Sequence, residues 1–154
     1  MKTTNLMRLA ITLGYKAGKK GDVPIGAIIV RNNKIIAKAY NTKEKSDIAT
    51  HHAEVIAIER ANKKLHSWRL DDCEMYVNLE PCPMCAGAIL NSRLKKVYYA
   101  LADKDSGAIS KFNLLESTLN HTTQSELLDE YSNEAKSMIQ DFFRSKRKNK
   151  KPKM

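Results

Sequence analysis

Two short motifs contain the residue types that could do chemistry. The first is His52-Ala-Glu54, and the second is Pro81-Cys-Pro-Met-Cys85. One His and two Cys supply three ligands that suit Zn²⁺ and leave a fourth position open for water. Glu54 is poorly placed to be a ligand but well placed to move the protons of that water. The spacing therefore predicts a hydrolytic zinc site with His52, Cys82 and Cys85 as ligands.

Both motifs lie where helices are expected to begin. Residues 53–65 and 82–90 are expected to be helical, and each segment follows a turn or a strand. The dipole and the free N–H groups at a helix start favour thiolates, so they lower the thiol pKa as metal binding requires. Proline is tolerated there because its missing N–H costs little. The second helix would therefore direct Cys82 and Cys85 towards one ion.

Each motif also has a simpler interpretation. A C-x-x-C alone could be a redox pair or half of a zinc ribbon, although no second C-x-x-C completes a ribbon. Glu54 alone would be an ordinary carboxylate in the first turn of a helix, where the dipole favours it. The two motifs occur together, in the right order and at expected helix starts, and this favours the zinc site.

The other elements are expected to alternate between strands and helices. The expected strands are residues 25–30, 34–39, 74–79 and 96–100, with the first two joined in a hairpin at Asn32-Asn33. Further helices are expected at residues 3–17, ended by Gly18, and at residues 127–148. Strands that alternate with short helices indicate an α/β layered fold in one domain.

The positive charge is concentrated at the C-terminal end. The net formal charge is +10 over 154 residues, and residues 144–154 hold seven basic side chains and no acidic one, which leaves +3 for the rest. Such a run often binds nucleic acid, but a solvated terminus has the same composition. The three Cys are too few for a disulfide framework, and the short apolar run at residues 9–13 predicts neither a signal peptide nor a membrane span. A cytoplasmic protein is therefore expected.

Beyond the two motifs, the chain resembles the TadA-type tRNA-specific adenosine deaminases along nearly its whole length. H-x-E with P-C-x-x-C marks the whole cytidine-deaminase-like superfamily, whereas Phe142-Phe143 on a basic final helix is more particular to the tRNA branch. The resemblance is carried by residues 22–27, Asn41, 57–61, 67–70, 79–88, 91–93, Asp103 with Gly107, 120–121 and 141–144.

The resemblance implies a three-layer α/β/α cytidine-deaminase-like fold, with a central mixed sheet of four or five strands and a long C-terminal helix. The fifth strand of the family should lie near residues 122–124, but this stretch is polar and short, so both strand counts remain open. The resemblance also implies one Zn²⁺ per subunit and a homodimer in which both subunits shape the RNA site.

A reaction and a role for each site residue follow from the same resemblance. Glu54 takes a proton from the zinc-bound water and passes it to N1 of adenine, hydroxide attacks C6, and Glu54 then protonates the departing amine, which leaves as ammonia. Asn41 holds the N7 edge of the purine, since a carboxamide can donate there. The implied walls of the base pocket are Pro24, Ile25, Ala53, Leu79 and Pro81, and the implied RNA contacts are Asp103, Phe142, Phe143 and Arg144.

The implied substrate is adenosine at the wobble position of tRNA, with arginine tRNA expected, bound through the anticodon stem-loop. An anticodon loop presents unstacked bases, which cost least to extrude. One ring of Phe142-Phe143 is expected to stack on a nucleotide and the other to anchor the last helix. Residues 1–143 would form the zinc-dependent deaminase domain, and residues 144–154 a basic extension that contacts phosphates.

Two other functions remain open. Pro83 also occurs at this place in deaminases of free guanine and cytosine, so a free nucleobase or nucleoside deaminase is the main alternative. The second alternative is a non-catalytic RNA-binding zinc module. Such a module would have no need of a proton shuttle, and Glu54 therefore argues against it.

Overall fold

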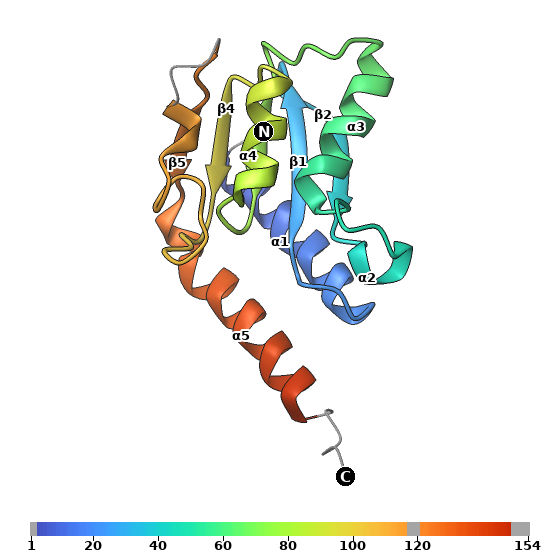
Figure 1. The fold of residues 1–154 in the computed structure, drawn as a ribbon, viewed down its shortest axis with the longest axis vertical. Helices are drawn as coiled ribbons and strands as arrows, with labels where there is room; N and C mark the ends of the chain where they lie inside the picture. The colour runs from blue at the N-terminus through green and yellow to red at the C-terminus, as the bar shows by residue number, and fades with distance from the viewer. Residues whose placement is uncertain (1–2, 117–120, 149–154) are drawn as a thin grey trace.

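The computed structural model describes residues 3–116 and 121–148 and has one mixed sheet at its centre (Figure 1). The strand order is β2-β1-β3-β4-β5. β1 pairs antiparallel with both β2 and β3, whereas the β3–β4 and β4–β5 pairs are parallel. The strands are β1 (Gly26–Arg31), β2 (Lys34–Tyr40), β3 (Glu74–Val77), β4 (Lys96–Tyr99) and β5 (Gln124–Leu127).

Helices cover both faces of this sheet, which confirms the predicted three-layer fold. α3 (Ala53–Leu65) and α4 (Pro83–Asn91) pack on one face, and α1 (Thr3–Lys19) and α5 (Ser132–Lys148) pack on the other (Figure 1). In the described part of the chain, no helix is both long and apolar enough to cross a membrane. The remaining helical segments are short: α2 (Lys43–Ser46) and the 3-10 turns η1 (Leu114–Glu116) and η2 (Asp129–Tyr131).

The central strand β1 contributes to both hydrophobic cores. Ala27 and Ile29 pack with α3 and α4, whereas Ile28 and Val30 pack with α1 and α5. A strand that is covered on both faces has a continuous apolar sequence, and this is the pattern that predicted it. At its start, a Cβ on Gly26 would lie only 2.2 Å from the carbonyl oxygen of Ala10, so the close approach of α1 requires a glycine there.

The strand directions bring the predicted site segments to one edge of the sheet. Gly26, at the start of β1, is paired with Tyr40, at the end of β2, and Ala27 is paired with Val77, at the end of β3. The segments that precede β1 and follow β2 and β3 therefore meet at the same edge. These segments contain most of the residues that the sequence assigned to the metal and the base, and ligands of α/β sheets commonly bind at such an edge.

Two predicted element boundaries are wrong. The last helix was expected to begin at residue 127, but Leu127 ends the fifth strand and α5 begins at Ser132. The fifth strand is present at Gln124–Leu127, so it begins two residues and ends three residues after the expected stretch, and its residues are all exposed. Its sequence has no strand pattern because it is held by backbone pairing with β4 and by the Lys96–Glu126 ion pair of 3.0 Å, rather than by buried side chains.

The end of α1 also differs from the prediction. The helix continues through Gly18 to Lys19. Gly21, with a φ of +84°, takes the left-handed conformation in the turn that follows. Gly18 has no positive φ and is part of the helix, so the glycine that follows the helix end is Gly21 rather than Gly18.

Candidate metal centre and base pocket

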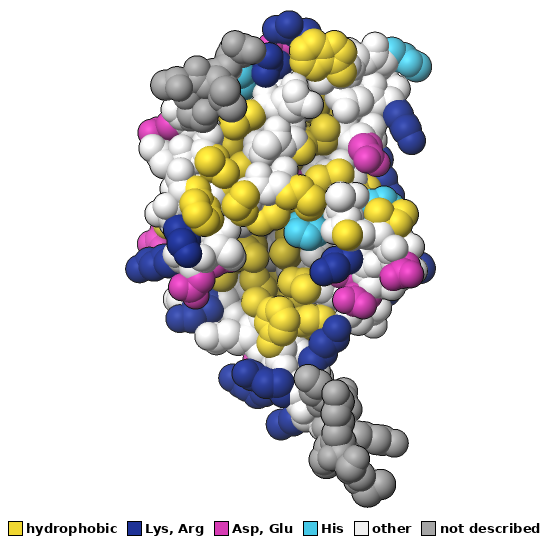
Figure 2. Space-filling model, in the orientation of Figure 1, with side chains coloured by type: hydrophobic (Ala, Val, Ile, Leu, Met, Phe, Trp, Pro, Cys, Tyr) yellow, Lys and Arg dark blue, Asp and Glu magenta, His cyan; other side chains and the backbone are white. Residues whose placement is uncertain are grey.

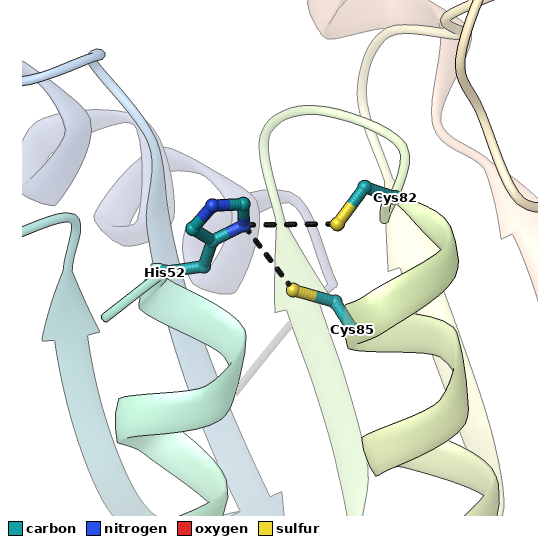
Figure 3. Close-up of side chains that lie close together, drawn as sticks. All are labelled: His52, Cys82 and Cys85. Carbon is teal, nitrogen blue, oxygen red and sulfur yellow. Dashed lines mark hydrogen bonds between the residues drawn. The ribbon is translucent and has the colours of Figure 1, made fainter. Parts of the chain in front are cut away.

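The three predicted metal ligands converge between the N-terminal ends of α3 and α4. His52 Nδ1 lies 3.7 Å from Cys82 Sγ and 3.5 Å from Cys85 Sγ (Figure 3). All three donor atoms lie within 4.8 Å of one another. His52 and Cys82 each occupy the extended position just before their helix, and Cys85 lies in the first turn of α4. The two helix starts therefore direct one nitrogen and two sulfurs to one point.

Local interactions fix both helix starts. Asn41 Oδ1 accepts a hydrogen bond of 2.7 Å from the backbone N–H of Ala53, the first residue of α3. This bond satisfies one of the free N–H groups that every helix start has. Pro83 is the first residue of α4, where its missing N–H leaves no donor unpaired. The ligands are thus held by backbone geometry as well as by their own side chains.

Glu54 is buried directly beside this cluster. Only 3% of the residue is exposed, and its Oε1 has no hydrogen-bond partner in residues 3–116 and 121–148. Burial penalises the charged form and raises the pKa of Glu54 to about 7. A carboxyl group whose pKa lies near neutrality can both take up and release a proton at physiological pH. The position predicted for the proton shuttle therefore has the properties that a shuttle needs.

The pKa values of the two cysteine thiols are shifted in opposite directions. The Cys85 thiol donates to the Cys82 sulfur, and this hydrogen bond lowers the pKa of Cys82 to about 4. The same hydrogen bond, together with burial, raises the pKa of Cys85. The pKa of His52 is raised by its hydrogen bond with Cys82. Because zinc needs both sulfurs as thiolates, its binding would release the proton of Cys85.

These residues fit a zinc ion with one open coordination position. One imidazole and two thiols form a donor set that zinc prefers, and three protein ligands are typical of catalytic rather than structural zinc. Buried polar atoms are normally hydrogen-bonded, so the unpartnered Oε1 of Glu54 indicates a group that acts on a bound molecule. No second group of three or more such ligands occurs in the described residues.

Asn41 is buried next to the metal cluster, with 4% of the residue exposed. Its Oδ1 is occupied by the backbone N–H of Ala53, and this bond fixes the orientation of the carboxamide. Its Nδ2 makes no hydrogen bond within the described part of the chain. The group left to bind a ligand is therefore a donor, which is what a purine N7 requires.

The other predicted base-pocket residues lie at the same edge of the sheet, and most of them are buried. Leu79 is partly exposed and lines a groove described below. Their side chains are mainly part of the core, so a base would meet them over small areas or through their backbone. The buried members of this set are Pro24, Ile25, Ala53 and Pro81.

Glu80 is a site residue that the sequence analysis missed. Its buried carboxylate accepts hydrogen bonds from the backbone N–H groups of Asp103, Ile109 and Ser110 at 3.1, 2.9 and 2.8 Å, and from the Ser110 hydroxyl. A Cβ on Gly107 would collide with this carboxylate. Glu80 therefore ties the loop of residues 103–110 to the segment that carries Cys82. A charged residue between two apolar positions, directly before a ligand motif, was the available signal.

Asp103 lies in this loop and uses its carboxylate within it. Its Oδ1 accepts from the backbone N–H groups of Asp105 and Ser106, both at 3.2 Å, and its Oδ2 accepts from the Ser106 hydroxyl at 2.7 Å. The structure therefore places Asp103 at the side of the groove next to α5, where its first observed role is to shape the loop.

A groove of about 760 Å³ lies between this loop and α5. Figure 2 shows the same face of the molecule, which is hollowed in its lower half, lined there by hydrophobic side chains and bordered by Lys and Arg. Phe143 lines the groove and is 44% exposed, whereas Phe142 lines a separate cavity against α1 and Pro24. Arg144 is exposed, and its Nη1 forms an ion pair of 3.4 Å with Asp141 Oδ1. The groove is lined by Val23, Leu79, Leu101, Ala102, Asp103, Lys104, Asp105, Leu127, Asp129, Ser132, Lys136, Ile139, Gln140 and Phe143.

The fold and the site together are those of a base deaminase, and the group of His52, Cys82 and Cys85 could hold a metal ion such as zinc. The family model of the MafB19-like deaminases matches residues 1–147. The chain is 44% identical over 149 residues to the tRNA-specific adenosine deaminase of Bacillus subtilis, which covers 94% of this chain and 91% of that protein. It is 41% identical over 145 residues to the enzyme of the same name from Aquifex aeolicus, with 93% and 95% covered. The chain therefore belongs to the MafB19-like deaminases and, among them, to the tRNA-specific adenosine deaminases.

Two solved structures are informative about the substrate. A tRNA:A34 deaminase, from work on A-to-I editing at the wobble position of transfer RNA, matches with a TM-score of 0.84 at 33% identity, over 88% of this chain and 99% of that one. A guanine deaminase from Bacillus subtilis matches with a TM-score of 0.66, also at 33% identity, over the whole of both chains. At equal identity, the backbone is more similar to that of the tRNA enzyme.

Proposed function

We propose that this protein deaminates adenosine to inosine at the wobble position of tRNA, with arginine tRNA as the substrate. The observation that carries the proposal is the convergence of His52, Cys82 and Cys85 beside the buried carboxyl of Glu54, whose Oε1 has no hydrogen-bond partner among the described residues. This site supports hydrolysis of an amino group from a base. Similarity to tRNA-specific adenosine deaminases over nearly the whole chain supports tRNA as the carrier of that base.

The overall reaction adds water to adenosine and releases inosine and ammonia. His52, Cys82 and Cys85 would hold the zinc, which supplies the Lewis acidity that makes water a nucleophile near neutral pH. Glu54 accepts a proton from the attacking water and delivers it to N1 of the base. It then accepts the second proton, from the hydroxyl group now bonded to C6, and delivers it to the amino group, which leaves as ammonia. Its pKa of about 7 allows both transfers at physiological pH.

Asn41 would bind the reacting base, and the groove would bind the nucleotides next to it. The Nδ2 of Asn41 would donate to N7 of the purine, because its Oδ1 is already bound to Ala53 N. Phe143 and Asp103 line the groove beside α5 and would contact nucleotides next to the extruded base. Phe142 would anchor α5 on α1, so that the two adjacent rings have separate roles.

The C-terminal end would bind the phosphates of the anticodon stem. We treat residues 1–143 as the deaminase domain and residues 144–154 as its basic extension. Four basic residues of the extension, Arg144, Lys146, Arg147 and Lys148, follow Phe143 on α5. Residues 149–154 lie outside the described residues. Contacts of Lys and Arg with phosphates give binding that weakens steeply with salt.

We further propose that the protein acts as a homodimer, with one Zn²⁺ per subunit, in the cytoplasm. Trp68, which is 58% exposed, and Ala88 line a small cavity on the outer side of α3 and α4, next to the helices that carry the metal ligands. An exposed tryptophan beside such a cavity is typical of an interface rather than of an isolated surface. Sedimentation of the purified protein at several concentrations tests this assembly.

Conversion of a short RNA is the most direct test of the proposed function. The purified protein is incubated with an arginine anticodon stem-loop that has adenosine at the wobble position, and inosine is detected as an A-to-G change. A second stem-loop with adenosine moved one position away is the matched control for position. We expect inosine in the first RNA and none in the second. Equal conversion of both would contradict the wobble assignment, and no conversion would contradict the assignment to RNA.

Deamination of free guanine or cytosine is the second candidate. It is supported by the match to a guanine deaminase structure over the whole chain and by Pro83 in the second motif. The exposed basic end and the open groove beside the site are not needed for a free base. Incubation with guanine and with cytidine, with ammonia release as the measurement, separates the two candidates.

A further inference from the structure

The Asn78 side chain clamps a segment that lies 52 and 54 residues earlier in the chain. Asn78 is completely buried and directly follows β3. Its Oδ1 accepts a hydrogen bond of 2.8 Å from Gly26 N, and its Nδ2 donates one of 2.9 Å to Pro24 O. A carboxamide offers a donor and an acceptor side by side without a charge. Both ends of the completely buried Asn78 side chain are therefore engaged by the backbone of this segment.

The residue between these two contacts is Ile25. Its N–H donates to Val23 O at 2.8 Å, and its carbonyl oxygen accepts from the backbone N–H of Asn41 at 3.0 Å. Through Gly26 N, the clamp therefore fixes the peptide group that contains the Ile25 carbonyl, and through Pro24 O it fixes the preceding peptide group. A continuous series of hydrogen bonds runs from Asn78 through Ile25 to Asn41, and from Asn41 Oδ1 to Ala53 at the start of α3.

The same segment shares two cavities with the two phenylalanines of α5. Val23 lines the groove that contains Phe143, and Pro24 lines the cavity that contains Phe142. The clamped segment thus lies between the metal end of the molecule and the helix proposed to bind RNA. A buried polar side chain whose hydrogen bonds are satisfied holds such a segment in one defined position.

We propose that Asn78 is a positioning residue for base recognition, which acts by holding the carboxamide of Asn41 at the purine N7. The proposal rests on the proposed function, because it needs a purine in the site. Without the clamp, the peptide groups around Ile25 gain freedom and the Asn41 donor loses its fixed place. Cys82 and Cys85 have separate anchors at Pro83 and α4, so loss of the clamp should affect the base contact more than it affects these two metal ligands.

A substrate that lacks N7 tests this directly. Arginine anticodon stem-loops with adenosine or 7-deazaadenosine at the wobble position are compared, and kcat/KM is measured for both. The quantity of interest is kcat/KM for the adenosine RNA divided by kcat/KM for the 7-deazaadenosine RNA. The intrinsic effect of the analogue on reactivity is the same for every variant, so differences in this ratio between variants report the N7 contact. In the unaltered enzyme, the contact contributes up to about tenfold to this ratio, the worth of one hydrogen bond.

We expect Asn78→Ala to lose activity on adenosine but little on the analogue, so that its ratio falls to that of Asn41→Ala. Asn62→Ala is the matched control. The Nδ2 of Asn62 also holds backbone carbonyls, of Ser67 at 3.0 Å and Trp68 at 3.2 Å, but it lies near the far end of α3. This control should keep the ratio of the unaltered enzyme. Asn78→Ser provides a second, less disruptive variant, and zinc content is measured for each protein.

The outcomes are distinguishable. If Asn78→Ala and Asn78→Ser keep the ratio of the unaltered enzyme while both substrates slow equally, Asn78 has a structural role alone and the proposal is wrong. The same conclusion holds if zinc content falls in parallel with activity. If the unaltered enzyme forms no inosine from the adenosine RNA, the proposed function itself fails, whatever the variants do.

Discussion

The metal end of the molecule and the C-terminal helix differ in burial and charge. At the metal end, Glu54 and Cys85 are buried, and the donor atoms of His52, Cys82 and Cys85 gather at two helix starts. α5 instead runs beyond the sheet, with only two of its described residues buried and an exposed basic last turn (Figure 1). Buried, preorganised groups suit chemistry, whereas exposed cations and rings suit the binding of a large, solvated partner. Changes at the first region should therefore lower kcat, and changes at the second should raise KM.

Removal of the metal should have the largest effect. Dialysis against a chelator is expected to abolish inosine formation, and added Zn²⁺ should restore it while added Mg²⁺ should not. One imidazole and two thiolates favour zinc over a hard cation that prefers oxygen ligands. The melting temperature should also fall, because binding stabilises the folded state. Full activity of a protein shown to be free of metal would contradict the assignment of the site.

Glu54→Gln should have the next largest effect, on kcat. The substitution keeps the size of the side chain but removes its ability to transfer protons, and general acid–base catalysis contributes about 10²–10⁴-fold. Zinc content and KM should stay close to those of the unaltered protein. Glu59→Gln, on the exposed side of the same helix, is the matched control and should be fully active. A Glu54 variant that forms inosine at an undiminished rate would refute the mechanism.

Truncation after Phe143 should change binding more than chemistry. The loss of residues 144–154 removes seven basic side chains. Each phosphate contact contributes about 0.7–0.9 to the slope of log affinity against log salt, so the slope should fall by up to about five or six. KM for tRNA should rise more than kcat falls. An unchanged KM would mean that the basic end is only a solvated terminus.

The two rings of α5 should respond differently to alanine. Phe143→Ala should weaken RNA binding by about 1–3 kcal/mol, the worth of one stacked base, and leave the melting temperature nearly unchanged. Phe142→Ala should lower the free energy of unfolding by about 2 kcal/mol, because a half-buried ring leaves its cavity against α1 and Pro24. RNA titrations and thermal melts of both variants check this. The opposite pattern would reverse the roles of the rings.

The sequence predicted the metal end far better than it predicted α5. Residues 53–65 were expected as a helix and form α3 with the same bounds, because helix period, a first-turn acid and a ligand motif all agree there. The start of α5 was placed at residue 127 because strand β5 has no buried residue and hence no strand pattern. Its existence depends on backbone pairing with β4, which no local pattern encodes.

The polar clamps were missed for a similar reason. Asn78 holds residues that lie more than 50 positions earlier in the chain, and Glu80 holds a loop that lies more than 20 positions later. A single sequence contains no signal for partners at such separations. Local patterns therefore located the groups that do chemistry, whereas the contacts that position them required the structure.

The central claim is that a zinc deaminase site is joined here to a surface for RNA. The most direct measurement of this claim is the ratio of kcat/KM for the arginine anticodon stem-loop with wobble adenosine to kcat/KM for free guanine, with the same enzyme preparation. The account predicts a ratio far above one, with inosine as the product and no measurable xanthine from guanine. A ratio below one, with xanthine formed and the RNA unchanged, would contradict it.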